Sequence, residues 1–227
     1  MSQQRVCRAL QESGDYLSGQ ELSRTLGISR AAVWKAVEAL RRQGYDIEAR
    51  TGRGYRLIGA PDFLSRETVE QYLHRTRENL HVLETVDSTN SFCRRLALEG
   101  APDGTAVLAD CQTAGRGRRG RSFQSPAGLG LYGSVLLRSS PEDAPRIPAL
   151  AATAVRRAIR RSCGLSCGIK WPNDLVLSGR KVCGILTEAA VGLETGTLNY
   201  MVLGAGVNLY PPAEGFPEEI QSIAGSV

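Results

Sequence analysis

Hydrophobic residues in the first sixty positions recur at helical spacing. Val6 and Leu10 lie about one turn apart, which predicts the buried face of a first helix. A second series follows the same period at Val33, Val37 and Leu40. Residues spaced by three or four positions lie on one side of a helix, so each helix is expected to bury one face. The pattern predicts a small helical head with its own core.

Capping residues mark the starts of two helices in this head. Ser18 and Glu21 form a capping box, which opens a short helix over residues 19–26. After a tight glycine turn, Ser29 caps a second helix over residues 30–43, which a glycine closes. Two helices joined by a Leu-Gly-Ile-Ser turn predict a helix-turn-helix.

A β-hairpin is predicted directly after these helices. Residues 45–49 and 55–58 have the character of strands, and the glycine-containing segment 51–54 joins them with Arg53 at its tip. Such a hairpin is the wing of a winged helix. The Gly-Ala-Pro segment 59–61 then predicts a linker.

Helices and strands alternate in the remainder of the chain. The expected helices span residues 66–74, 89–100 and 148–161, and the expected strands span 81–85, 105–110, 131–137, 175–176, 181–189 and 198–207. The last two strands can pair as an antiparallel hairpin across residues 192–196. We expect an α+β fold: a winged helix-turn-helix domain over residues 1–60 and a mixed, mainly antiparallel sheet domain over residues 64–227.

Composition excludes several classes of protein. Hydrophobic residues make up 42% of the chain, which supports a buried core. No apolar run approaches the ~20 residues of a membrane span, and the N-terminus has no signal-peptide pattern. The six cysteines are scattered without the paired spacing of a zinc site, so we expect free thiols, no metal site and a cytoplasmic location.

Positive charge is concentrated in the head. Residues 1–60 contain ten lysines and arginines and six acidic residues, a net charge of +4 out of the +5 of the whole chain. The remaining residues contain eighteen basic and seventeen acidic residues. This distribution indicates a polyanionic partner for the head.

The segment Gly115-Arg-Gly-Arg-Arg-Gly-Arg121 is the first of five segments that indicate chemistry. Its glycines allow close backbone approach to a ligand, and its four arginines suit phosphate oxygens. Its sequence matches the dinucleotide-binding pattern G-x-G-x-x-G, but that pattern requires a helix to start inside the motif. Residues 122–126 follow without helical periodicity, so we reject a dinucleotide site. A flexible basic surface loop remains the alternative.

The second and third segments contain lysines. Lys170-Trp-Pro-Asn-Asp174 packs a cation, an aromatic, an amide and a carboxylate around a proline, although a strand end with a type I turn also explains it. Lys181 opens the strand Lys181–Leu186 and can reach a ligand or remain a solvated strand-start residue.

Each of two further segments can be explained either by local structure or by ligand binding. Ser88, Thr89 and Asn90 precede a helix, where hydroxyl groups are first of all N-caps, yet the same groups can hold a small polar ring. The segment Gly204-Ala-Gly-Val-Asn208 ends a hydrophobic strand and can be a bend that glycine permits.

In order and approximate spacing, these segments resemble one family closely, the biotin–protein ligases. With the winged head in front, the chain is similar to the bifunctional type, biotin ligase and biotin-operon repressor (BirA type). The resemblance covers essentially the whole chain. It implies that biotin reacts with Mg·ATP to give biotinyl-5′-AMP, and that a lysine of a biotin carboxyl carrier protein domain then accepts the biotin.

The resemblance also implies roles for individual residues. The biotin site would contain Ser88, Thr89, Asn90, Gln112, Arg116, Gly117, Arg118 and Lys181. The ATP site would contain Arg118, Arg119, Arg121, Phe123, Lys170, Asn173 and Asn208. The catalytic group would comprise Lys181, Arg116, Arg118, Lys170 and Asp174, because two anions must be brought together. No residue is assigned to a metal.

For the head, the resemblance implies operator DNA as a partner and a homodimer when biotinyl-5′-AMP is bound. The DNA contacts would come from Ser29, Arg30, Trp34, Lys35 and Arg53. Protein contact is the competing role for a winged helix.

Two departures from the family pattern affect these expectations. Phe123 stands where a tryptophan is usual, and the chain stops at Val227, before the SH3-like C-terminal domain of family members. We therefore expect a catalytic domain that is incomplete at its C-terminus. The alternative functions are a biotin-sensing repressor without ligase turnover and a lipoate-type ligase.

Overall fold

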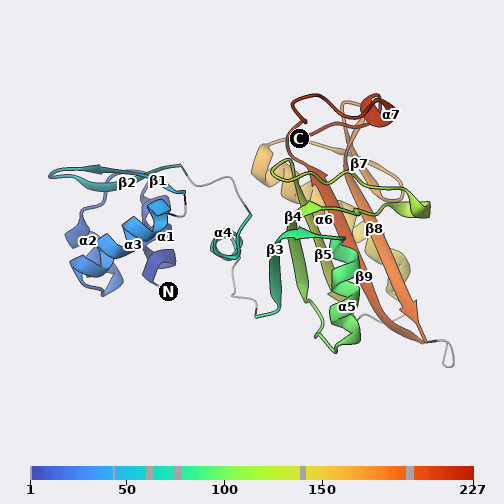
Figure 1. Ribbon diagram of the computed structural model, residues 1–227, viewed down its shortest axis with the longest axis horizontal. Coiled ribbons are helices and arrows are strands. Elements are labelled where there is room, and N and C mark those ends of the chain that lie inside the picture. The colour runs from blue at the N-terminus through green and yellow to red at the C-terminus, as the bar shows by residue number, and fades with distance from the viewer. Residues whose placement is uncertain (1, 43, 60–63, 74–77, 139–141, 193–196) are drawn as a thin grey trace. The chain divides into compact units, whose positions relative to one another are not determined.

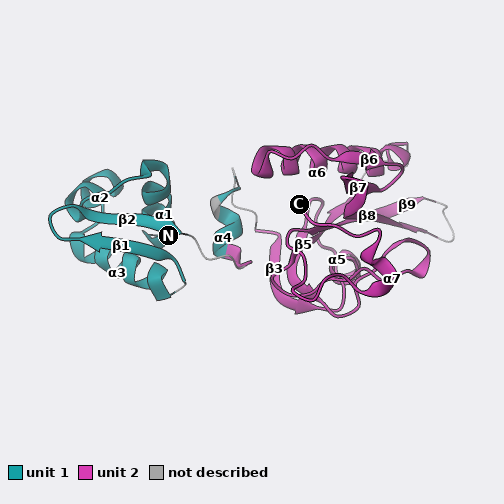
Figure 2. Cartoon of the chain, turned by 90° about the horizontal axis from the view of Figure 1, so that it is seen from above, with its two compact units in different colours: residues 1–63, 67–76 teal, residues 64–66, 77–227 magenta. Residues whose placement is uncertain are grey.

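The computed structural model describes residues 2–42, 44–59, 64–73, 78–138, 142–192 and 197–227. The chain divides into two compact units, one of residues 1–63 and 67–76 and the other of residues 64–66 and 77–227 (Figure 2). Each unit has its own hydrophobic core. Residues 60–61 of the expected linker and residue 74 of the expected helix 66–74 lie outside the described residues.

The first unit is a winged helix-turn-helix. Its elements are α1 (Ser2–Ser13), α2 (Gly19–Leu26), α3 (Arg30–Arg42), β1 (Asp46–Arg50), β2 (Gly54–Gly59) and α4 (Arg66–Gln71). The strands β1 and β2 pair antiparallel, as expected for a wing. The core residues recur at the predicted spacing and include Val6, Leu10, Val33, Val37 and Leu40.

The predicted caps are confirmed in this unit. Ser18 Oγ accepts a hydrogen bond from the backbone N–H of Glu21 at 3.1 Å, and Ser29 Oγ accepts one from that of Ala32 at 3.1 Å. Gly27 ends α2 with a φ of 65°, a conformation that favours glycine. Gln43, the expected end of α3, lies outside the described residues, and the helix is described to Arg42.

The second unit is built on a seven-stranded sheet of order β3-β4-β5-β9-β8-β7-β6 (Figure 1). The strands are β3 (Leu80–Val86), β4 (Ala106–Gln112), β5 (Gly130–Leu137), β6 (Gly168–Lys170), β7 (Asp174–Leu177), β8 (Arg180–Val191) and β9 (Leu198–Asn208). Only the β3–β4 pair among them is parallel, which confirms the mixed, mainly antiparallel sheet. The helices are α5 (Thr89–Leu98), α6 (Ile147–Cys163) and α7 (Glu218–Gln221).

Residues of β9 alternate between two cores. Leu203, Ala205 and Val207 pack with the core beneath α6, whereas Tyr200 and Val202 pack with the core beneath α5. Because successive side chains of a strand point to opposite faces, α5 and α6 cover opposite faces of the sheet (Figure 1). The face that carries α5 also contains Gly204 and Gly206.

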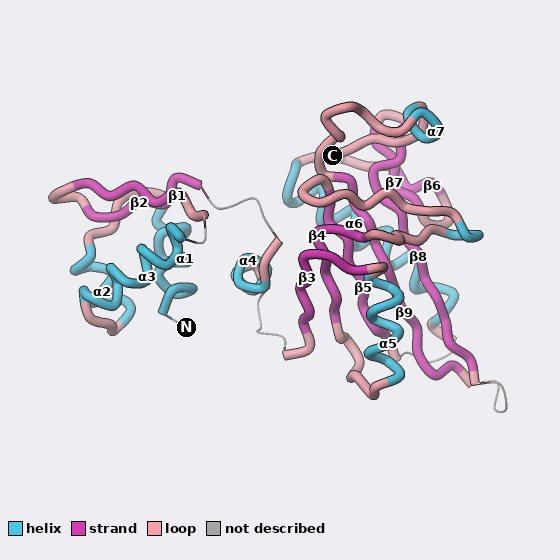
Figure 3. The backbone as a smooth tube through the Cα atoms, viewed as in Figure 1, coloured by secondary structure: helices cyan, strands magenta, loops and turns pink. Residues whose placement is uncertain are grey.

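Three local features differ from the sequence predictions (Figure 3). The helix expected over residues 66–74 is described only as α4, to Gln71. The short strand β6 was not predicted, because three residues are too few to show a period. A 3-10 turn over Arg118–Gly120 inside the arginine segment was not predicted, although no α-helix begins there, as expected. Residues 193–196 of the predicted hairpin turn lie outside the described residues.

No helix among the described residues is both long enough and apolar enough to span a membrane.

Candidate functional site

The floor of the site is made of glycines on adjacent strands. Gly184 of β8 pairs with Gly206 of β9, and Leu186 pairs with Gly204. A Cβ at Gly206 would lie 2.5 Å from the ring of Phe123, and a Cβ at Gly204 would lie 2.1 Å from Asn90 Oδ1. Since real side chains do not approach so closely, only glycine lets these two residues lie directly on the sheet.

The N-terminus of α5 supplies one wall. Ser88 caps this helix, and Ser88, Thr89 and Asn90 are all almost fully buried. Asn90 Nδ2 donates to Glu188 Oε2 at 2.8 Å and approaches the Leu186 carbonyl at 3.4 Å. The capping role of Ser88 and its place in a pocket wall are therefore compatible.

Gln112, at the end of β4, joins this wall to the segment after the arginines. Its Oε1 accepts from the Thr89 backbone N–H at 2.8 Å, and its Nε2 donates to Ser125 Oγ at 2.7 Å. Ser125 Oγ in turn approaches the Phe123 carbonyl at 3.1 Å. These bonds set the direction of the Gln112 amide and tie the Phe123 backbone to the sheet.

The arginine segment is folded into a compact loop. Arg116 and Ser122 form an isolated antiparallel bridge, and the Gly117 N–H donates to the Arg121 carbonyl at 2.7 Å. Arg119 has a φ of 58°, in the left-handed region that non-glycine residues rarely adopt. Such a closed loop presents several guanidinium groups from one short stretch of backbone.

Two of these arginines contact residues far along the chain, one in β8 and one in the turn between β6 and β7. Arg116 Nη2 lies 3.3 Å from Glu188 Oε1 on β8, and Arg118 Nη1 donates to Asn173 Oδ1 at 3.0 Å. Within the described part of the chain, neither Arg119 nor Arg121 forms an ion pair. Their charges remain available to an anionic ligand.

Lys181 and Asp174 lie together at the other side of the loop. Lys181 Nζ is 2.8 Å from Asp174 Oδ1 and 5.9 Å from the centroid of the Phe123 ring. Asn173, next to Asp174, donates its amide to the Ile185 carbonyl at 3.1 Å. Asn173 and Asp174 therefore both contact β8, the strand that carries Lys181.

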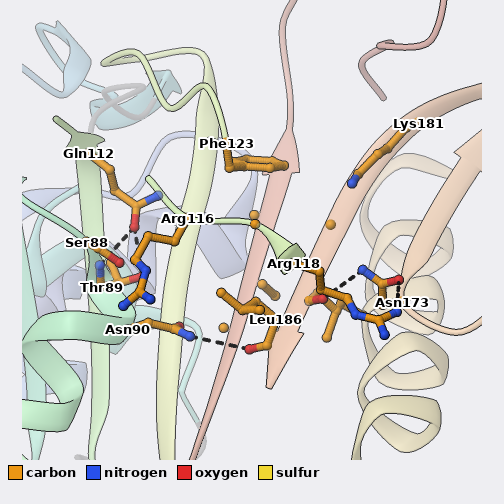
Figure 4. Close-up of a pocket in the computed structure, with 16 residues that line it drawn as sticks. Ser88, Thr89, Asn90, Gln112, Arg116, Arg118, Phe123, Asn173, Lys181 and Leu186 are labelled. Atoms are coloured by element: carbon orange, nitrogen blue, oxygen red, sulfur yellow. Dashed lines mark hydrogen bonds between the residues drawn. The ribbon is translucent and has the colours of Figure 1, made fainter. Parts of the chain in front are cut away.

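The residues that the sequence assigned to biotin line one pocket together (Figure 4). Ser88, Thr89, Asn90, Gln112, Arg116, Gly117, Arg118 and Lys181 all belong to its wall. A second pocket adjoins it through shared residues. Its lining includes Asp174 and every residue that the sequence assigned to ATP. These are Arg118, Arg119, Arg121, Phe123, Lys170, Asn173 and Asn208.

Sequence reasoning missed three polar residues of this site. Ser125 and Ser134 are almost fully buried and bond to Gln112 and Asn90, and Glu188 bonds to Asn90 and pairs with Arg116. Single serines and a single glutamate in strands carry no local signal. The alternation along β8 places Glu188 on the same face as Gly184 and Leu186, and this is the only clue in the sequence.

Carboxylates at the two pockets are few. The described residues contain no group of three or more histidine, cysteine, aspartate or glutamate side chains that could hold a metal ion. Asp174 and Glu219 line the second pocket. Mg²⁺ is commonly held by one or two carboxylates together with substrate phosphates, so these residues fit a metal that arrives with a nucleotide.

Burial suppresses the ionisation of two groups close to the site. Burial raises the pKa of the Cys183 thiol to about 12, and it likewise raises the pKa of Tyr132 to about 12. Both groups are therefore neutral at physiological pH. Neither Cys183 nor Tyr132 can serve as an ionised nucleophile or base.

In the head, the residues assigned to DNA lie on exposed surface. Ser29, which caps α3, is exposed, and Arg30, Trp34 and Lys35 are exposed on α3 outside its buried face. Arg53 is exposed at the wing and lies 3.6 Å from Asp15, with its guanidinium carbon 4.3 Å from the centroid of the Tyr16 ring. Arg50 and Arg56, which sequence reasoning did not single out, also lie over this ring.

Two family models match the chain. The model of the Biotin/lipoate A/B protein ligase family matches residues 82–208, and that of an HTH domain matches residues 3–56. The first match contains the arginine loop, the segment 170–174 and Lys181. The second contains α2, α3 and β1.

Relatives and solved structures agree with these matches. The chain is 39% identical over 221 residues to the bifunctional ligase/repressor BirA of Bacillus spizizenii, covering 96% of this chain and 67% of the relative. The biotin protein ligase of Aquifex aeolicus in complex with biotin and ATP is similar at 33% identity and a TM-score of 0.54, over 66% of this chain and 60% of that one. The biotin protein ligase of Leishmania major in complex with biotinyl-5-AMP is similar at 28% identity and a TM-score of 0.54, over 66% of this chain and 64% of that one.

The chain spans 67% of the length of the Bacillus relative and 60% of the Aquifex chain.

Proposed function

The chain belongs to the Biotin/lipoate A/B protein ligase family, and from this premise we propose that it is a biotin–protein ligase with a DNA-binding head. It activates biotin with ATP to biotinyl-5′-AMP and transfers the biotin to a lysine of a carrier protein. One observation carries the proposal: a neutral polar wall from α5 and β4 meets three cationic side chains, Arg116, Arg118 and Lys181, in one pocket.

The two walls of this pocket suit the two ends of biotin. The ureido ring offers both N–H donors and a carbonyl acceptor, and Ser88, Thr89 and Gln112 provide hydroxyl and amide groups to match them. The valerate carboxylate then extends towards Lys181, which lies on the opposite side of the pocket from Gln112 (Figure 4).

Positive charge is the main requirement of the first step. The biotin carboxylate attacks the α-phosphate of ATP, a phosphate–oxygen bond breaks and pyrophosphate leaves. Because both reactants are anions, Lys181, Arg116 and Arg118 reduce their repulsion and stabilise the charge that develops in the transition state. Arg118 is held towards the second pocket by its hydrogen bond to Asn173.

The second pocket is the proposed nucleotide site. Arg119 and Arg121 face the phosphates, and Phe123 offers its ring to the nucleotide or the acyl chain. Lys170 and Asn208 complete the lining. Asp174 or Glu219 would contribute a carboxylate oxygen to a Mg²⁺ that accompanies ATP, and the ion would offset the charge of the phosphates.

Transfer requires a neutral amine. The carrier lysine loses a proton and attacks the acyl carbon of biotinyl-5′-AMP, so an amide forms and AMP leaves. We assign Asp174 and Lys170 to the orientation of this incoming amine, since both line the pocket next to Lys181. Asp174 is paired with Lys181 at 2.8 Å.

The head is proposed to bind operator DNA. α3 presents Arg30, Trp34 and Lys35 to solvent, and the wing adds Arg53. Helix-turn-helix proteins read two half-sites as dimers, so we propose a homodimer when biotinyl-5′-AMP is bound. Phosphate contacts predict binding that weakens steeply with salt.

One experiment tests the ligase proposal. The protein is incubated with Mg·ATP, a purified carrier domain and either biotin or lipoate, and the carrier is weighed by mass spectrometry. A biotin-sized mass gain that depends on ATP and Mg²⁺ supports the proposal, and a lipoyl gain contradicts it.

The same assay addresses a biotin-sensing repressor without turnover. Tight biotin binding and an operator mobility shift, with no gain in carrier mass, would favour the sensor. An operator mobility shift that is the same with and without biotin would contradict a biotin-responsive repressor, whether or not it is also a ligase.

A further inference from the structure

Glu188 contacts two residues of the proposed biotin pocket without lining it. Its Oε2 accepts from Asn90 Nδ2 at 2.8 Å, and its Oε1 lies 3.3 Å from Arg116 Nη2. We propose that Glu188 is a positioning residue for biotin, which sets the direction of the Asn90 amide and holds the first arginine of the loop at the pocket. This inference rests on the proposed function, because it names a determinant of the same site.

The sheet register brings this carboxylate to the pocket. Leu186 of β8 pairs with Gly204 of β9, which pairs on its other side with Ser134 of β5. Glu188 follows Leu186 by two residues and therefore lies on the same face, one step along the strand. Asn90 lies over Gly204, where a Cβ would be 2.1 Å from its Oδ1, so the amide has little room to move.

The carboxylate determines which groups donate hydrogen bonds. An ionised glutamate only accepts, so the amide nitrogen of Asn90 faces Glu188 and its oxygen faces Ser134 Oγ, 2.6 Å away. Ser134 must donate to that oxygen. The hydroxyl group of Ser134 has only this one proton. Ser134 therefore cannot also be the donor in its 2.8 Å contact with Thr89 Oγ1.

Thr89 consequently has no proton for a ligand. Thr89 Oγ1 lies 2.8 Å from Ser134 Oγ and 3.1 Å from Gln112 Oε1, and both are acceptors towards it. Its hydroxyl proton goes to one of them, and only lone pairs remain for the pocket. Thr89 is thus an acceptor that suits a ureido N–H of biotin. The direction of this preference originates at Glu188, which is three hydrogen bonds away through Asn90 and Ser134.

The second contact acts on the arginine loop. Arg116 is about half exposed, whereas the Glu188 side chain is 26% exposed on the rigid sheet. The ion pair therefore links the more exposed guanidinium of the loop to a carboxylate on the sheet. It also offsets one of four closely spaced positive charges, which lowers their mutual repulsion before an anion binds.

The test is Glu188→Gln, which keeps the shape and removes the charge. Biotin affinity is measured by calorimetry, and adenylate formation by pyrophosphate release. We expect the Kd and KM for biotin to rise roughly tenfold to a hundredfold, the range for loss of a charge-assisted hydrogen bond, with the KM for ATP nearly unchanged. A residue that served only stability would lower the melting temperature without this split.

Glu84→Gln is the matched control, because Glu84 is exposed on β3 of the same sheet and the charge change is identical. In an Asn90→Ala background, Glu188→Gln should have a smaller effect, since one of its two contacts is already lost. If Glu188→Gln does not fold, Glu188→Asp is used. It retains the charge but cannot reach both partners, so its Kd should be intermediate.

The outcomes separate the two proposals. Wild-type protein that does not bind biotin overturns the proposed function, and the inference with it. Wild-type protein that binds biotin while Glu188→Gln or Glu188→Asp binds equally well overturns the inference alone. An undiminished effect in the Asn90→Ala background also overturns it.

Discussion

Lys181 Nζ lies 2.8 Å from Asp174 Oδ1, across the antiparallel strands β7 and β8. The two side chains are about one third and one fifth exposed, so the pair is only partly screened by water. An anionic ligand at Lys181 competes with Asp174 for the same ammonium group. The ion pair therefore holds the Lys181 ammonium group at the junction of the two pockets.

Removal of the Lys181 charge should stop the first step. For Lys181→Ala we expect adenylate formation to fall roughly a hundredfold to a thousandfold, the cost of losing one electrostatic stabiliser of a transition state. Operator binding by the head should be retained. Pyrophosphate release and a mobility shift measure the two activities, and equal loss of both would contradict the separation of the units.

Gly206→Ala should displace the Phe123 ring. The new Cβ would lie 2.5 Å from a ring carbon, so the ring must leave its place on the sheet. If Phe123 stacks on the nucleotide, ATP should bind roughly 5- to 150-fold more weakly, the range for one lost base–aromatic contact. The control is Gly59→Ala in the head, where the nearest atom to a new Cβ is 3.9 Å away. Unchanged ATP affinity in Gly206→Ala would exclude this role of Phe123.

Leu40→Ala should unfold the head selectively. Leu40 is 2% exposed in the core of the first unit, and such a cavity costs about 2–5 kcal/mol. A small domain has little stability to spare, so operator binding should be lost. Biotin binding should persist, because the pocket belongs to the other unit. Calorimetric unfolding should show a lower melting temperature for the first unit and an unchanged melting temperature for the second unit.

The ion pair of Asp87 and Arg95 should give a small stabilisation that depends on pH. The hydrogen bonds from Arg95 hold the pKa of Asp87 below its usual value. The stabilisation is therefore present above the unfolded pKa of about 3.9 and disappears as the pH falls through the lower folded value. Both side chains are about half exposed, so Asp87→Asn should cost only about 0.2–1 kcal/mol at neutral pH.

Chemical denaturation of wild type and Asp87→Asn at pH 7 and at low pH measures this difference. A gap between the two proteins that widens on acidification would have the wrong sign for an aspartate with a lowered pKa.

Cysteine alkylation should distinguish Cys163 from Cys183. Cys163 is exposed at the end of α6, whereas Cys183 is buried in β8 and its pKa is raised by burial to about 12. Since the thiolate is the reactive form, iodoacetamide at mildly alkaline pH should modify Cys163 and leave Cys183 intact. Peptide mass mapping reads both sites. Modification of Cys183 in folded protein would show that β8 opens.

Short-range patterns were enough to predict most elements. The helical period of Val33, Val37 and Leu40 and the cap at Ser29 act within a few residues, so α3 could be placed from the sequence. Very short elements escaped, as β6 did, because three residues do not establish a period. The segment with Arg119 also folds into a 3-10 turn that no local pattern indicated.

The candidate site was only partly predictable. Dense segments such as Gly115–Arg121 and Lys170–Asp174 attract attention because several functional side chains stand together. Glu188 and Ser134 stand alone in ordinary strands. Glu188 and Ser134 are 98 and 44 positions away from Asn90 in the sequence. Patterns of residue spacing within one element cannot predict contacts at such separations.

The sequence by itself determined the two-unit organisation, the winged head and the set of segments that carry polar and cationic groups. These follow from local propensity, capping and periodicity, which act over one or two turns or strands. Tertiary structure alone decided that β9 lies between β5 and β8 and that glycines form the floor. It also decided that a single glutamate orients the polar wall, because strand pairing is set by the burial of whole faces in a common core.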